Sequence, residues 1–181
     1  MLTSFFYVLW YTKKGYEGWV NMTDYKKYTD DGIELVYKGE FNKAIENFTK
    51  SIELKNDWEI PYFYRAVSYQ ALEEFDNAMI DYSKALSIND RMTDAYYNKA
   101  KIALSRKDIP NPDINKAIED LNKALELDEK FVDALFAMAA AYKKLEDYHK
   151  SLEYLEKLLE IEPQAVHAKA LKKLILTKYM V

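Results

Sequence analysis

The sequence predicts an all-α fold built from stacked helical hairpins. Residues 59–92 form a 34-residue stretch with two helical patterns separated by a short turn, and the same pattern recurs once before it and twice after it. Apolar and small residues in it are spaced by three and four, as on the buried face of an α-helix. The 181 residues include only four Gly and four Pro, too few for a loop-rich β protein. Together these observations predict a helical repeat array.

The packing stripe is clearest in residues 59–92. On its first helix, Tyr62, Ala66 and Tyr69 share one face. The stripe of the second helix comprises Phe75, Ala78, Met79, Tyr82, Ala85 and Leu86. Small residues on a buried face let two helices approach closely. We therefore expect the two helices to pack as an antiparallel hairpin.

The chain divides into a non-repeat segment, four blocks and a final helix. Their expected ranges are 1–24, 25–58, 59–92, 93–131, 132–165 and 166–181. The third block is longer than the others because its inter-helix turn carries the insertion RKDIPNPD at 106–113. Pro110 and Pro112 cannot continue a helix, and Asp113 can cap the next one.

The last helix is predicted to close the array. An amphipathic pattern runs over residues 164–179. One face carries Val166, Ala170, Leu171, Leu174 and Ile175, and the other carries Lys169, Lys172, Lys173 and Lys178. A repeat array needs a cap on its open apolar end. We expect the apolar face to cover the fourth hairpin and the lysines to face water.

These features resemble the tetratricopeptide repeat, a 34-residue helix-turn-helix unit. Three places recur in the four blocks: Gly32, Ala66, Ala100 and Ala139; then Ala44, Ala78, Ala117 and Ser151; then Phe48, Tyr82, Leu121 and Tyr154. The resemblance covers residues 25–165. The chain departs from the family pattern in two ways. The turn of the third block is long, and only the fourth block has a terminal proline, Pro163. The resemblance implies a right-handed superhelix, an α-solenoid of four hairpins with a C-terminal capping helix.

By the same resemblance, the first helix of each block lines a concave groove that binds a protein or peptide. The groove-facing positions would be Lys26, Thr29, Ile33, Val36, Ile60, Phe63, Val67, Gln70, Asp94, Tyr97, Lys101, Leu104, Asp133, Phe136, Ala140 and Lys143. The main candidates for partner contacts are Ile33, Phe63, Val67, Tyr97, Lys101 and Phe136. The alternative is that the rings of Phe63, Tyr97 and Phe136 only pack against neighbouring helices.

One sub-family with this repeat grips the acidic C-terminal carboxylate of chaperone tails, using Lys, Asn and Arg side chains on successive first helices. The corresponding places here hold Thr29, Ile33, Tyr64, Asp94 and Asn98. No basic pair remains to hold a carboxylate. The sequence therefore argues against a chaperone-tail clamp.

The N-terminal segment SFFYVLWY, residues 4–11, is strongly apolar but too short to span a membrane, which needs about 20 residues. No basic residue precedes it and no small-residue cleavage site follows, so we expect no secretory signal and a cytoplasmic protein. Three roles stay open: a cap on the first repeat, an internal ligand in the groove, or contact with a membrane or membrane complex through residues 1–11. The docking residues would be Phe5, Phe6 and Trp10.

The composition bounds the chemistry. A net charge of −4 argues against nucleic-acid binding through phosphates, and the absence of Cys excludes thiolate chemistry. His149 and His167 lack further ligands at metal-binding spacing, and no phosphate-binding loop or hydrolase motif occurs. We expect a protein interaction scaffold or adaptor with no catalytic residues, cofactor or metal. The alternative is a peripheral subunit or assembly factor on a membrane complex, and self-association stays open.

Overall fold

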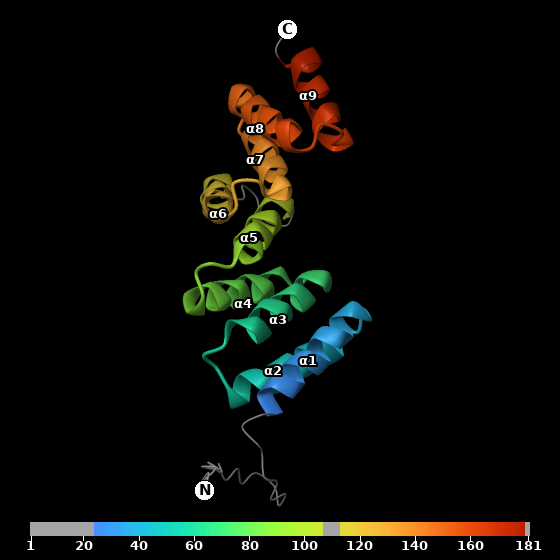
Figure 1. Cartoon of the computed structure of the whole chain (residues 1–181), viewed down its shortest axis with the longest axis vertical. Helices are drawn as coiled ribbons and strands as arrows, with labels where there is room; N and C mark the ends of the chain where they lie inside the picture. Colours follow the sequence, from blue (N-terminus) through green and yellow to red (C-terminus); the bar gives the residue numbers. More distant parts are fainter. Residues whose placement is uncertain (1–23, 107–112, 180–181) are drawn as a thin grey trace, which may run out of the picture. The chain divides into compact units, whose positions relative to one another are not determined.

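A computed structural model describes residues 24–106 and 113–179, and every regular element in these ranges is an α-helix (Figure 1). The helices are α1 (Asp24–Tyr37), α2 (Phe41–Leu54), α3 (Glu59–Ala71), α4 (Phe75–Ile88), α5 (Thr93–Ser105), α6 (Ile114–Leu127), α7 (Val132–Lys144), α8 (Tyr148–Ile161) and α9 (Val166–Lys178). The predicted all-α fold is confirmed for these residues.

Successive helices pair into hairpins: α1 with α2, α3 with α4, α5 with α6, and α7 with α8. The chain divides into two compact units, residues 1–88 and 89–181. The first unit contains α1 to α4, drawn from blue to green in Figure 1, and the second contains α5 to α9, drawn from green to red. Contacts inside each hairpin are the densest in both units, as expected for repeats that pack mainly on their neighbours.

Small residues are buried at the same place in the first helix of each hairpin. Gly32, Ala66, Ala100 and Ala139 are all fully or almost fully buried. At Gly32, a Cβ atom would lie 2.6 Å from Cε1 of Phe48. The aromatic ring of Phe48 therefore occupies the space that any larger residue at position 32 would need.

The turns inside three hairpins share one backbone conformation. Gly39, Glu73 and Glu146 each follow a first helix and have φ values of 74°, 60° and 61°. At Glu73, the Glu73 N–H donates to the Gln70 carbonyl, and the next N–H donates to the Tyr69 carbonyl. These two hydrogen bonds form a Schellman motif, in which a residue with left-handed backbone conformation lets the last carbonyl groups of the helix accept hydrogen bonds.

Side-chain caps begin two of the second helices. Asp113 accepts a hydrogen bond from the Lys116 N–H at the start of α6, which confirms the predicted cap, and Asp147 accepts one from the Lys150 N–H at the start of α8. The prolines of the preceding insertion, at 107–112, lie outside the described residues.

The packing face of α9 differs from the prediction. Ala168 and Ile175 are buried and Leu171 is half-buried, whereas Val166, Ala170 and Leu174 are exposed. Lys172 is half-buried beside Glu156 of α8, to which its Nζ atom donates a hydrogen bond of 2.9 Å. The helix is therefore rotated from the expected orientation, because the small Ala168 permits the closest approach to the cluster of Leu135, Leu155 and Leu158.

No helix in residues 24–106 or 113–179 is long and apolar enough to cross a membrane. The N-terminal docking residues Phe5, Phe6 and Trp10 lie outside the described residues, so their role stays a prediction.

Candidate functional site

In the first unit, the predicted contact residues Phe63 and Val67 lie on α3, and Ile33 lies on α1; all three are half-buried. The Phe63 ring makes edge contacts with Tyr64 and with Tyr82 of α4, at centroid distances of 5.3 and 5.7 Å. The ring is thus held against its own hairpin while part of its surface stays accessible. The packing role weighed from the sequence is therefore present, and the groove role of Phe63 stays a prediction.

Thr29 is a correction to the predicted groove positions. Its side chain is fully buried rather than groove-facing. Its hydroxyl donates to the Tyr25 carbonyl at 3.1 Å and lies 2.8 Å from the Ser51 hydroxyl on α2. The short polar side chain satisfies its hydrogen bonds inside the hairpin, which leaves it no group to offer a ligand.

In the second unit, Tyr97 and Lys101 lie on α5 and Phe136 lies on α7. The Tyr97 ring packs edge-on against Phe131, with ring centroids 5.2 Å apart, and the Nζ atom of Lys101 lies 5.8 Å from the Tyr97 centroid. Burial raises the pKa of the Tyr97 hydroxyl, and the nearby Asp133 carboxylate raises it further. Tyr97 therefore stays a neutral hydrogen-bonding group at physiological pH.

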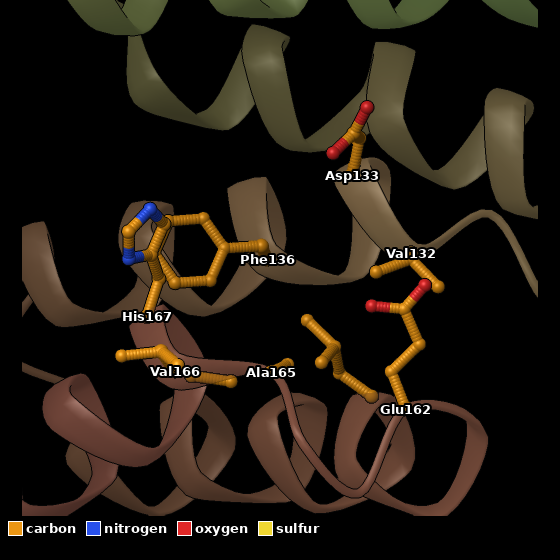
Figure 2. A pocket seen from close by; sticks show the side chains of 9 residues that line it. Val132, Asp133, Phe136, Glu162, Ala165, Val166 and His167 are labelled. Carbon is orange, nitrogen blue, oxygen red and sulfur yellow. The ribbon is translucent and has the colours of Figure 1, made fainter.

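Phe136 lines a pocket of about 410 Å³ formed by α7, the end of α8 and the start of α9. The other lining residues are Val132, Asp133, Leu158, Glu162, Ala165, Val166, His167 and Ala168. Figure 2 shows the rings of Phe136 and His167 on one side and the carboxylates of Asp133 and Glu162 on the other. The pocket is large enough for one or two side chains of a bound segment.

The ionisable groups that line this pocket are the carboxylates of Asp133 and Glu162 and the imidazole of His167. None of the nine lining residues is Lys or Arg. In the part of the chain that the structure describes, neither Asp133 nor Glu162 has an ion-pair partner, whereas Glu153 and Glu156 on α8 are paired with Lys157 and Lys172. Asp133 is one of the groove positions predicted from the sequence, whereas Glu162 is not, because it follows a second helix.

Two ion pairs that were not predicted from the sequence join the helices of the middle hairpins. Arg65 on α3 donates to both carboxylate oxygens of Asp81 on α4, at 2.6 and 2.9 Å. Lys99 on α5 lies 3.2 Å from Asp120 on α6. Each of the four residues is the seventh of its helix, so a repeat-by-repeat comparison of charges could have found the pairs. These charged side chains link the two helices of each hairpin and are largely covered.

The remaining candidates do not gather into a reactive centre. His149 on α8 and His167 on α9 are both exposed. Among residues 24–106 and 113–179, no three His, Asp or Glu side chains are grouped closely enough to hold a metal ion.

Known protein families match both units. The profile of the Fis1 C-terminal tetratricopeptide repeat matches residues 132–179, a TPR repeat profile matches 113–146, and a tetratricopeptide repeat profile matches 62–91. This chain is a tetratricopeptide repeat protein. Repeats of this family generally mediate protein–protein interactions, and the family is generally non-enzymatic.

Individual relatives of this tetratricopeptide repeat protein agree with that assignment. The TPR repeat-containing protein MJ1428 of Methanocaldococcus jannaschii is 27% identical over 144 residues, which cover 80% of this chain and 24% of that protein. This chain spans about a quarter or less of the length of the first curated relatives.

Solved structures share the fold. A crystal structure of MamA has a TM-score of 0.76 and 20% identity, covering 84% of this chain and 80% of MamA. The first TPR of Spaghetti (RPAP3), bound to the HSP90 peptide SRMEEVD, has a TM-score of 0.58 and 20% identity, covering 76% of this chain and 97% of that domain. At this identity the likeness concerns the fold alone.

Proposed function

We propose that this tetratricopeptide repeat protein is a non-enzymatic scaffold that binds a segment of a partner protein on the exposed faces of its first helices. The observation that carries the proposal is the pocket beside Phe136, because it combines an apolar floor with a few polar groups, as ligand sites in proteins do. A groove-facing aromatic residue predicted from the sequence thus lines a cavity of the right size for a side chain.

A related fold supports this mode of binding. The tetratricopeptide repeat domain of Spaghetti (RPAP3) holds a short peptide, SRMEEVD. The acidic peptide itself is a poor candidate for the present chain. Thr29 is buried, and Ile33, Tyr64, Asp94 and Asn98 supply no cation to hold a carboxylate. We therefore expect a partner segment of different chemistry.

The test is the selection of binding peptides from a random 12-residue library displayed on phage. Peptides enriched on the wild-type protein should bind with micromolar Kd, since three partly buried aromatic anchors contribute about 1.5–3 kcal/mol each before ordering costs are subtracted. Phe136→Ala and Tyr97→Ala should each weaken binding at least about tenfold, which corresponds to about 1.4 kcal/mol.

Ile80→Ala is the matched control. Ile80 lies on α4, is 66% exposed and is not among the groove-facing positions, so its truncation removes a similar apolar surface elsewhere. All variants are first compared by circular dichroism, because Tyr97 and Phe136 also pack inside the second unit. Equal affinity of the enriched peptides for wild type, Tyr97→Ala and Phe136→Ala would show that the binding site lies elsewhere.

A further inference from the structure

We propose that the pocket between α7 and the start of α9 binds a Lys or Arg side chain of the partner segment. This inference rests on the proposed scaffold function and specifies the chemistry of its partner. The cationic group would lie between the carboxylates of Asp133 and Glu162, and the aliphatic part of the side chain would lie on the Phe136 ring (Figure 2).

The lining of the pocket fits an amphipathic side chain. Val132, Phe136, Leu158 and Ala165 supply apolar surface, and the polar groups are two carboxylates and the His167 ring. Lys and Arg bury their methylene stems on apolar surface while the charged end stays with polar groups. The flat guanidinium of Arg also stacks on aromatic rings, which the Phe136 ring can provide.

The charge of the pocket is not balanced inside the protein. No cation lines it, and neither carboxylate forms an ion pair in residues 24–106 and 113–179. Two α8 carboxylates are paired, Glu153 with Lys157 and Glu156 with Lys172 of α9. Unpaired like charges around a concave site attract a ligand of opposite charge.

Glu162 and Asp133 differ in how their charges affect the helices that carry them. Glu162 is the C-cap residue of α8, where the partial charge of the helix end is negative. A carboxylate at this end lowers helix stability, whereas Asp133 lies in the first turn of α7, where a carboxylate is favourable. Helix stability therefore favours Asp133 but not Glu162. Asp128 at the C-cap of α6 shows that a carboxylate is tolerated at such a helix end, so what distinguishes Glu162 is its place in the pocket beside Asp133.

The experiment is a titration of ¹⁵N-labelled full-length protein with acetyl-Leu-Arg-amide, followed by NMR. The control ligand is acetyl-Leu-citrulline-amide, which has nearly the same shape without the charge. We expect the Arg ligand to shift the backbone amides of Asp133, Phe136 and His167, with a Kd in the millimolar range. The citrulline ligand should bind at least about fivefold more weakly, since it forms no charge-assisted hydrogen bond.

Variants separate binding from folding. Glu162→Gln should weaken the Arg ligand about fivefold while leaving the thermal unfolding midpoint unchanged or slightly higher, because it removes a carboxylate from a helix C-terminus. Glu160→Gln removes a carboxylate from the last turn of the same helix but lies outside this pocket, so it should leave the affinity for the Arg ligand unchanged.

Three results would overturn the inference: equal affinity for the two ligands, no amide shifts at the pocket at about 20 mM Arg ligand, or unchanged affinity in Glu162→Gln. A failure here is distinguishable from a failure of the scaffold function. Some library peptides could lose affinity in Tyr97→Ala and Phe136→Ala and yet bind equally well after their Arg or Lys is replaced by citrulline or norleucine. That result would support binding in the groove and exclude the cation pocket.

Discussion

Arg65 and Asp81 join the two helices of the second hairpin through a bidentate contact, with donor–acceptor distances of 2.6 and 2.9 Å. Asp81 is only 4% exposed, and the Arg65 guanidinium also donates to the Thr49 hydroxyl on α2 at 3.0 Å. One side chain thereby connects α2, α3 and α4. Its charge is matched inside the first unit, in contrast to the unpaired carboxylates of the second.

Removing one partner of this pair should be costly. Arg65→Met leaves a buried carboxylate without its cation, and such a loss lowers the free energy of unfolding by about 3–5 kcal/mol. Urea unfolding followed by circular dichroism measures the change. Lys38→Met, which breaks the exposed pair of Lys38 with Glu34, is the control and should have little effect. Similar losses in the two variants would contradict a structural role specific to Arg65.

Gly32→Ala should destabilise the protein despite the higher helix propensity of Ala. The new Cβ would lie 2.6 Å from the buried Phe48 ring, and overpacking of this kind costs about 1–3 kcal/mol. Phe48→Leu should rescue part of the loss, because Leu121 accompanies Ala100 at the same places in the third block. Thermal unfolding of the two single variants and of the double variant gives the coupling free energy between positions 32 and 48. A Gly32→Ala variant that is more stable than wild type would refute the expected clash.

Glu73→Gly and Glu146→Gly should stabilise the protein. Both glutamates have positive φ, as Gly39 does in the first block. Removing the Cβ relieves about 1–2 kcal/mol of strain and costs about 0.5–1 kcal/mol in chain entropy, a net gain of about 0.5–1 kcal/mol per site. For a chain of this size that raises Tm by about 1–4 °C. Glu74→Gly, one residue later, is the control and should not stabilise; a lower Tm in both test variants would exclude the strain.

The stability contributed by Asp120 should increase as pH falls. Burial raises the pKa of its carboxyl, although Lys99 at 3.2 Å opposes the rise. A folded-state pKa above the unfolded value means that the folded chain binds this proton more tightly. The contribution is therefore complete below the unfolded pKa of about 4 and is lost as pH rises through the folded pKa. Urea unfolding at pH 4 to 7 measures the free energy of unfolding of wild type and of Asp120→Asn. The difference between them should shift in favour of wild type as pH falls. A shift in favour of wild type as pH rises would mean that the ion pair with Lys99 dominates.

Deletion of residues 1–21 tests the roles left open for the N-terminal segment. Four residues of α1 are exposed where the equivalent residues of α3, α5 and α7 are buried or half-buried: Lys27, Asp30, Asp31 and Glu34. That face already suits water, which favours a deletion variant with an unchanged Tm. A clear fall in Tm would support the segment as a cap on the first repeat. Unchanged stability with lost association with lipid vesicles would support membrane contact.

The helices and their pairing could be predicted from the sequence because both depend on local periodicity. Spacings of three and four place Ala66 and Ala78 on the facing sides of adjacent helices wherever the helices form. The rotation of α9 could not be predicted in the same way. Both Ala168 and Val166 are apolar, and the choice between them depends on the surface that α7 and α8 present.

The sequence by itself determined an all-α array of tetratricopeptide hairpins, because each repeat carries the same buried small residues at fixed spacing. The tertiary structure alone decided which charges are neutralised. Arg65 and Asp81 meet across two helices, whereas Glu162 meets no cation in the described residues and lies at a pocket with Asp133 and Phe136. The physical reason is that electrostatic pairing depends on distances between side chains of different helices, which helical periodicity does not specify.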